Sequence, residues 1–151
     1  MVYGEGADPR TGDLKSSTVI YGPGKIVTHD STNNTFDLTA VGEIAVGVSA
    51  GASSRDVDGT LETSSATFSY YPLGGVLMVQ SAASQTWTTG LPVYITNSGL
   101  ATTSSGSSAK KLGLYVGNGE TTAALGANGA GDTTNTEGTM IPVMTAGAEI
   151  A

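Results

Sequence analysis

The sequence is most informative in what it lacks. It has 151 residues with no cysteine, one histidine and one tryptophan, and only 13% of its residues are charged. The absence of cysteine excludes disulfides and every cysteine-ligated metal site. A single histidine excludes histidine-rich zinc sites and makes any Ser-His-Asp triad depend on His29. We therefore expect no enzymatic activity, no cofactor and no metal ion.

Basic residues are also scarce. Six Lys and Arg residues stand against 13 Asp and Glu, which gives a formal net charge of −7. This balance argues against nucleic-acid binding, because nucleic acids require a basic footprint. An acidic surface keeps a glycine-rich protein soluble and suits a basic partner.

Long hydrophobic runs are missing as well. Uninterrupted apolar runs such as 76–79 fall far short of the ~20 residues that a membrane-spanning helix requires. The first six residues have neither the basic stretch nor the apolar stretch of a secretory signal. We expect neither a membrane span nor a cleaved leader.

The chain does contain many glycines and short β-branched runs separated by turn residues. No segment combines Ala and Leu at helical spacing with Glu and Lys. Short strands separated by frequent turns predict an all-β domain, built as a small β-barrel, a β-tulip-like fold or a sandwich. The predicted strands cover residues 18–21, 25–29, 35–40, 44–49, 66–71, 75–80, 92–97, 112–116, 120–125 and 140–146.

Alternation of apolar and small residues predicts which side chains share a face of each strand. Leu112, Leu114 and Val116 are expected on one face, and 117–119 is expected to turn this strand into a hairpin with its successor. Pro142 is expected near a sheet edge or a strand start, because proline cannot donate a ladder hydrogen bond. Further apolar pairs are expected on one face of their strands: Phe36 with Leu38, Phe68 with Tyr70, Val93 with Ile95, and Ile141 with Val143.

Residues 1–17 are polar, glycine-containing and non-periodic, and we interpret them as a flexible N-terminal arm. Residues 18–151 are expected to form a single β domain. An arm that becomes ordered on contact can add a strand to the exposed sheet edge of a partner. The apolar side chains expected to anchor the arm are Val2, Tyr3, Leu14, Val19 and Ile20.

Residues 56–61, Asp-Val-Asp-Gly-Thr-Leu, resemble the nucleophile motif of haloacid-dehalogenase-type phosphatases. That resemblance implies nucleophilic attack by the first Asp and acid/base catalysis by the second, at the end of a buried strand in an α/β fold. Here the residues before the motif are small and polar, and no helices are predicted. Asp56, Asp58 and Glu62 also lack the ligand spacing of an EF-hand. We interpret the motif as a surface turn, because Asp-Gly is a strong turn former.

Other candidate chemistry has simpler interpretations. His29 ends a predicted strand and no Gly-x-Ser-x-Gly elbow accompanies it, so we interpret it as a hydrogen-bonded polar residue. The glycines in 113–119 are not a phosphate loop, because no Lys-Ser/Thr pair follows. The aromatic residues, including Trp87, are expected to fill the core and interfaces; the alternative is an exposed stacking platform.

Three segments resemble the head decoration proteins of tailed bacteriophages, in particular the lambda type. They are Gly-Lys-Ile-Val-Thr-His-Asp-Ser-Thr at 24–32, Ala-Val-Gly-Glu-Ile-Ala-Val-Gly-Val at 40–48, and Phe-Ser-Tyr-Tyr-Pro-Leu-Gly-Gly-Val-Leu at 68–77. Gly-Leu-Pro-Val-Tyr at 90–94, Leu-Gly-Leu at 112–114 and Ile-Pro-Val at 141–143 resemble related capsid cement proteins. The resemblance covers roughly residues 18–146. The loops at 50–65, 102–109 and 126–139 are longer than in the lambda type.

The resemblance implies a structural virion protein that binds the outside of an icosahedral capsid and stabilises it. It further implies a homotrimer, with the major capsid protein as partner and the outer capsid surface as location. The alternative is a receptor- or glycan-binding β module of a phage tail fibre or surface adhesin, which the exposed loops and the Tyr and Trp content motivate.

Overall fold

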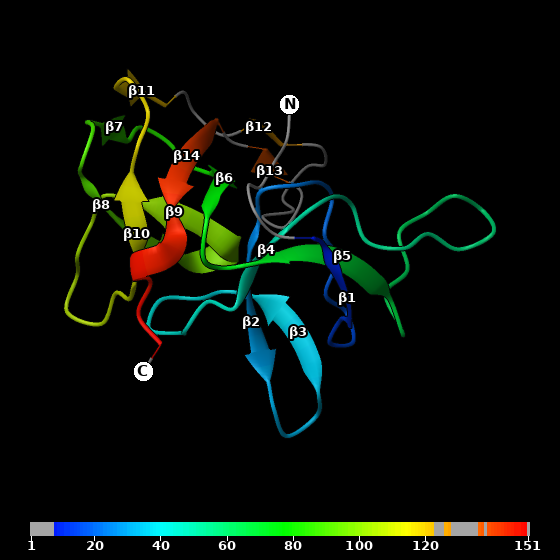
Figure 1. Cartoon of the computed structure of the whole chain (residues 1–151). Helices are drawn as coiled ribbons and strands as arrows, with labels where there is room; N and C mark the ends of the chain where they lie inside the picture. Colours follow the sequence, from blue (N-terminus) through cyan, green and yellow to red (C-terminus); the bar gives the residue numbers. More distant parts are fainter. Residues whose placement is uncertain (1–7, 123–125, 128–135, 138, 151) are drawn as a thin grey trace.

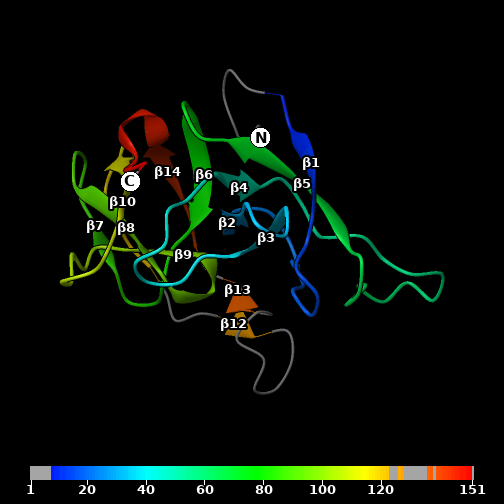
Figure 2. The ribbon, with the colours of Figure 1, turned by 90° about the horizontal axis from the view of Figure 1, so that it is seen from below.

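The computed structural model describes residues 8–122, 126–127, 136–137 and 139–150 and shows the predicted all-β fold (Figure 1). Its described elements are strands, apart from two single-turn 3-10 helices, η1 (Asn97–Gly99) and η3 (Thr145–Gly147). Most strands belong to two five-stranded antiparallel sheets. Figure 2 shows these sheets beside each other, with β1 to β5 on one side and β6, β8, β10 and β14 on the other.

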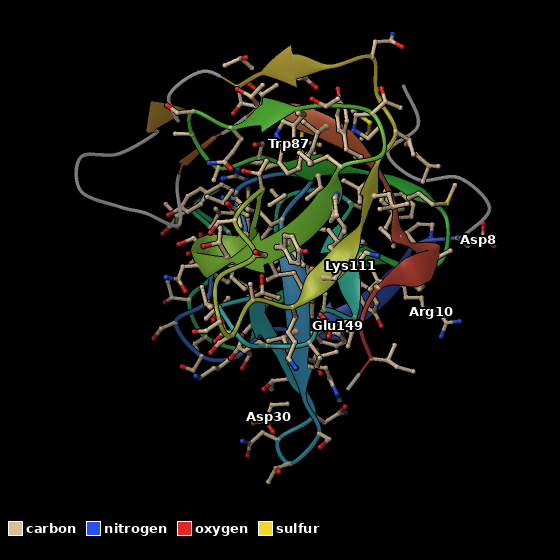
Figure 3. All side chains as sticks on the ribbon, turned by 90° about the vertical axis from the view of Figure 1, so that its left-hand side faces the viewer. Asp8, Arg10, Asp30, Trp87, Lys111 and Glu149 are labelled. Atoms are coloured by element: carbon tan, nitrogen blue, oxygen red, sulfur yellow. The ribbon has the colours of Figure 1, made fainter. Side chains whose placement is uncertain are left out.

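The first sheet has the strand order β1-β5-β4-β2-β3. Its strands are β1 (Arg10–Asp13), β2 (Ile26–Asp30), β3 (Thr35–Leu38), β4 (Gly47–Ser49) and β5 (Thr67–Pro72). Asp30 organises the β2–β3 turn, because its carboxylate accepts the Thr32 N–H at 2.9 Å and the Asn33 amide at 2.6 Å. Figure 3 shows Asp30 near the tip of this hairpin, which projects from the body of the molecule.

The first sheet curls until its two edge strands meet at one end. Leu14 and Phe36 form a parallel bridge, and the Lys15 N–H donates to the Phe36 carbonyl at 2.8 Å. At the other end of these strands the edges stay apart, so the sheet does not close into a barrel.

The second sheet has the order β6-β14-β10-β8-β9. Its strands are β6 (Val76–Gln80), β8 (Pro92–Thr96), β9 (Leu100–Thr102), β10 (Lys111–Tyr115) and β14 (Met140–Met144). Its edges also approach, through a parallel bridge between Ser81 and Ala101. Two short antiparallel pairs flank it: β7 (Thr86–Trp87) with β11 (Glu120–Thr121), and β12 (Gly126–Ala127) with β13 (Thr136–Glu137).

Two hydrophobic cores lie on opposite faces of the first sheet. The first core fills the sandwich between the sheets, where Ile26 and Val48 pack with residues of the second sheet. The second core lies inside the curl of the first sheet and consists of Leu14, Ile20, Val27, Phe36, Ala66 and Phe68. The neighbours Ile26 and Val27 thus enter different cores, because successive strand residues point to opposite faces.

The predicted side-chain faces are confirmed for four strands. Val93 with Ile95 and Ile141 with Val143 are buried in the first core, while Phe36 with Leu38 and Phe68 with Tyr70 pack in the second. The predicted strand at 18–21 does not form. That segment is instead tied to Ser53, whose Oγ accepts the Ile20 N–H at 3.1 Å and whose N–H donates to the Ile20 carbonyl at 2.7 Å.

The prediction that Leu112, Leu114 and Val116 share a buried face is wrong. Lys111 pairs with Tyr94 and Gly113 pairs with Val93, so Leu112 is an extra residue in the ladder. A bulge of this kind shifts the alternation by one residue. Leu112 and Tyr115 are buried, whereas Leu114 and Val116 are exposed.

The predicted hairpin across 117–119 is also wrong. After this turn, β11 pairs with β7 rather than with β10, and β10 pairs with β8 and β14. The Tyr115 hydroxyl occupies the turn and accepts the Gly119 N–H at 3.1 Å. A Cβ atom at Gly117 would lie only 2.4 Å from that hydroxyl, so the turn packs around the side chain.

Pro142 lies in a central strand and not at an edge, which corrects the prediction. The Pro142 carbonyl accepts the Val116 N–H at 3.1 Å. Because the nitrogen and the carbonyl of a strand residue point to the same neighbouring strand, the Pro142 nitrogen also faces the β10 side. Val116 follows the last residue of β10, where the β10–β14 pairing ends. The missing proline donor therefore costs one terminal ladder bond rather than an interior one.

Candidate functional site

The residues predicted to anchor the arm are structural in this fold. Leu14, Val19 and Ile20 have 3%, 8% and 0% of their surface exposed, and Leu14 and Ile20 belong to the second core. Because they are buried, these three side chains are not free to bind a partner, which corrects the prediction. Val2 and Tyr3 lie outside the described residues.

The prediction that residues 1–17 form a flexible arm is wrong for residues 10–17, and residues 1–7 lie outside the described part of the chain. Residues 10–13 form β1, which pairs in register with β5, and the Leu14 N–H donates to the Ala66 carbonyl at 2.8 Å. Gly12 is required in β1, because a Cβ atom there would lie 2.5 Å from the Phe36 ring. Residues 10–17 are therefore part of the β domain.

The segment 56–61 is a turn, as interpreted from the sequence. The Asp56 carboxylate accepts the Asp58 N–H at 2.9 Å and the Thr60 hydroxyl at 2.8 Å. These hydrogen bonds, that of Thr60 first, lower the pKa of Asp56. The described residues contain no group of three or more His, Asp or Glu side chains that could hold a metal ion.

His29 and Trp87 have the structural roles expected of them. His29 Nε2 lies 3.0 Å from Asn34 Oδ1, and its ring packs 4.8 Å from that of Phe36. Trp87 is only 1% exposed and its Nε1 donates to Ser81 Oγ at 2.9 Å. A glycan platform that uses Trp87 is incompatible with this burial.

The surface that stands out is the outer side of the second sheet. Six apolar side chains form two rows across the neighbouring strands β6, β14 and β10, which Figure 1 shows side by side. We call this surface the apolar face; its rows are Val76–Met144–Leu114 and Met78–Pro142–Val116.

The register of the strands builds the apolar face. Leu77, Val79, Ile141 and Val143 point into the first core, so the residues that alternate with them point outward. Leu114, Met144 and Val116 keep 38%, 38% and 41% of their surface exposed, and Val76, Met78 and Pro142 are half-buried. Neither row contains a charged residue, although the chain carries a net charge of −7.

The apolar face has no group that can perform chemistry. Contiguous exposed apolar surface of this kind marks protein contact sites, because burying it removes apolar area from water. A signal for it was present in the sequence. The runs 76–79 and 140–144 are apolar at every position instead of alternating, which is typical of strands covered on both faces.

Among the described residues, the structure contains no helix with the length and apolar character of a membrane span. Comparison of the sequence with models of known protein families and with curated proteins finds no match.

Proposed function

We propose that this chain is a capsid decoration protein: a structural virion protein that binds the outside of an icosahedral phage capsid, with the major capsid protein as partner, and stabilises it. The observation that carries the proposal is the apolar face, an uncharged surface on the rigid second sheet. The resemblance of residues 18–146 to head decoration and cement proteins supports the same function.

The apolar face also changes the expected mode of attachment. Leu14, Val19 and Ile20 are unavailable as anchors because they are buried. We propose instead that Leu114, Val116 and their row neighbours contact the capsid or the adjacent copies of a homotrimer. Weak contacts repeated over a shell give high avidity, so no single contact needs to be strong.

Copy number is the first test of the proposal. Quantitative mass spectrometry of purified virions should find hundreds of copies, near parity with the major capsid protein. A handful of copies would assign the chain to the tail or to a fibre, which is the alternative function. Absence from virions would end the proposal.

A matched pair of variants tests the contact surface. Val116→Asp puts a carboxylate into the apolar face, and Val57→Asp makes the same change at a fully exposed residue of the 56–61 turn. Burial of an unpaired carboxylate is strongly unfavourable. Cosedimentation with capsids that lack this chain should fail for Val116→Asp and persist for Val57→Asp. Equal binding of the two variants would exclude the apolar face as the contact.

A further inference from the structure

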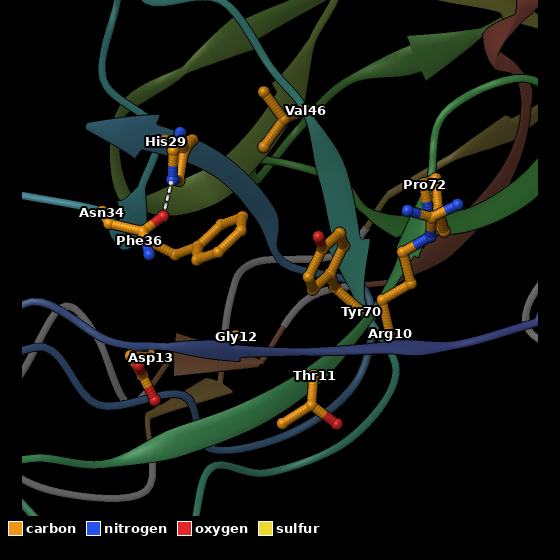
Figure 4. Close-up of a pocket in the computed structure, with 10 residues that line it drawn as sticks. All are labelled: Arg10, Thr11, Gly12, Asp13, His29, Asn34, Phe36, Val46, Tyr70 and Pro72. Atoms are coloured by element: carbon orange, nitrogen blue, oxygen red, sulfur yellow. Dashed lines mark hydrogen bonds between the residues drawn. The ribbon is translucent and has the colours of Figure 1, made fainter. Parts of the chain in front are cut away.

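The open end of the curled first sheet holds a second candidate site that capsid attachment does not use. Where β1 and β3 stay apart, a cavity of about 480 Å³ opens between them (Figure 4). Phe36, Val46, Tyr70 and Pro72 form its apolar part. Its volume falls within the ~300–1,000 Å³ typical of small-molecule sites, which often lie in the mouths of β-barrels.

The aromatic floor of this cavity is fixed in place by two glycines. A Cβ atom at Gly12 would lie 2.5 Å from the Phe36 ring, and one at Gly47 would lie 2.6 Å from the Tyr70 ring. Each ring therefore lies directly against the backbone of a neighbouring strand. The two rings are 4.8 Å apart and tilted by 42°. Phe36 is only 9% exposed, so the half-buried Tyr70 ring that packs on it supplies the aromatic surface that a ligand meets, and its fixed position lowers the entropic cost of binding.

The rim of the cavity supplies both hydrogen-bond donors and an acceptor. Arg10 and the Asp13 carboxylate come from β1, and His29 and Asn34 come from the β2–β3 hairpin. His29 Nε2 contacts Asn34 Oδ1, so the Asn34 amide group keeps its N–H donors for a ligand. In Figure 4 the Arg10 and His29 side chains stand on opposite sides of the opening.

We propose that this cavity binds a neutral saccharide ring. A pyranose presents an apolar C–H face, which fits the half-buried Tyr70 ring, and hydroxyls that both donate and accept, which fit the mixed rim. The charges of Arg10 and Asp13 offset each other at the rim. With one cationic and one anionic side chain on the rim, the cavity favours neither an anionic nor a cationic ligand. The proposal is independent of capsid attachment, because the apolar face belongs to the other sheet.

Saturation-transfer difference NMR of the full chain tests the proposal directly. The probes are methyl glucopyranoside, methyl galactopyranoside and methyl mannopyranoside, with glucuronate as the anionic comparator and a capped Val-Thr-Val-Thr peptide as a strand-forming one. We expect at least one neutral pyranoside to bind, with its saturated protons on one C–H face. Binding of glucuronate alone, of the peptide alone, or of no probe would overturn the proposal.

Three variants locate the binding. Arg10→Gln removes the guanidinium, and Asn34→Gly removes the amide at a residue whose φ of 54° suits glycine. Each should weaken pyranoside binding about fivefold, the effect of one lost hydrogen bond. The control Arg55→Gln removes an equal charge at a residue that precedes the 56–61 turn and does not line the cavity, and it should leave binding unchanged. Thermal unfolding of each variant verifies the fold, and equal binding by all three variants would place the site elsewhere.

Discussion

Gly113 has the closest backbone contact of the glycines in the described part of the chain. A Cβ atom there would lie 1.9 Å from the Met144 carbonyl oxygen, which belongs to the backbone and not to a movable side chain. Gly113→Ala should therefore destabilise the protein by at least about 1–3 kcal/mol, the usual cost of overpacking. The control Gly51→Ala adds its methyl group to open space and should stay within about 1 kcal/mol of the parent. Urea unfolding measures both, and equal stability of the two variants would contradict the packing.

The hydrogen bonds to Asp30 lead to a prediction about how the stability of the fold depends on pH. The Asn33 side-chain amide, followed by the Thr32 N–H, lowers the pKa of Asp30 below its usual 3.8. Because the folded-state pKa is the lower one, this carboxylate stabilises the fold above its unfolded pKa. The stabilisation disappears as the pH falls through the folded value. In an NMR titration, Asn33→Ala should raise the Asp30 midpoint toward 3.8 and leave that of Asp56 unchanged. An unchanged Asp30 midpoint would exclude Asn33 as the main cause.

At the scale of elements, β1 is an integral strand of the first sheet. Deletion of residues 1–17 removes β1 and the buried Leu14. Deletion of residues 1–9 keeps both and serves as the control. Loss of a buried leucine alone costs about 2–5 kcal/mol, so the longer deletion should melt about 5 °C or more below the shorter one. Differential scanning calorimetry compares the two, and equal midpoints would mean that β1 contributes nothing to stability.

The strands show which parts of the fold a sequence pattern can predict. Alternation placed Val93 with Ile95 correctly, because β8 itself contains no extra residue: its ladder with β9 is regular, and the bulge in its ladder with β10 lies on the β10 side. It failed at Leu112–Val116, since a bulge depends on the partner strand and not on local sequence. The prediction that Pro142 lies near a sheet edge or strand start failed for the same reason. A proline is tolerated at this position because β10 ends opposite it, and where β10 ends depends on the assembled sheet.

The candidate site was predictable only in part. Turn chemistry identified 56–61 as a surface turn, since Asp56 accepts the local hydrogen bonds donated by the Asp58 and Gly59 N–H groups. The anchors Leu14, Val19 and Ile20 were misjudged because their polar, glycine-containing surroundings suggested exposure, whereas distant strands bury them. The cavity between β1 and β3 had no local signal at all, because it forms from strands that only the curl of the sheet brings together.

The whole molecule should unfold in one step, although it has two cores. Ile26 belongs to one core and the adjacent Val27 to the other, so neither core can be lost while β2 remains in place. Val27→Ala should therefore shift the fluorescence transition of Trp87, in the far core, together with the far-ultraviolet circular dichroism transition. Chemical unfolding followed by both signals measures this. Separate midpoints would show that the cores unfold independently.

The parallel bridges at Leu14–Phe36 and Ser81–Ala101 affect how copies of this protein behave when they are close together. Each bridge joins the outermost strands of a sheet at one point, which shortens the unpaired backbone edge that could template a neighbouring molecule. Edge-to-edge polymerisation, a common route of β proteins into aggregates, therefore has less exposed edge from which to start. We expect this to help a protein whose copies are held close together to avoid joining into fibres.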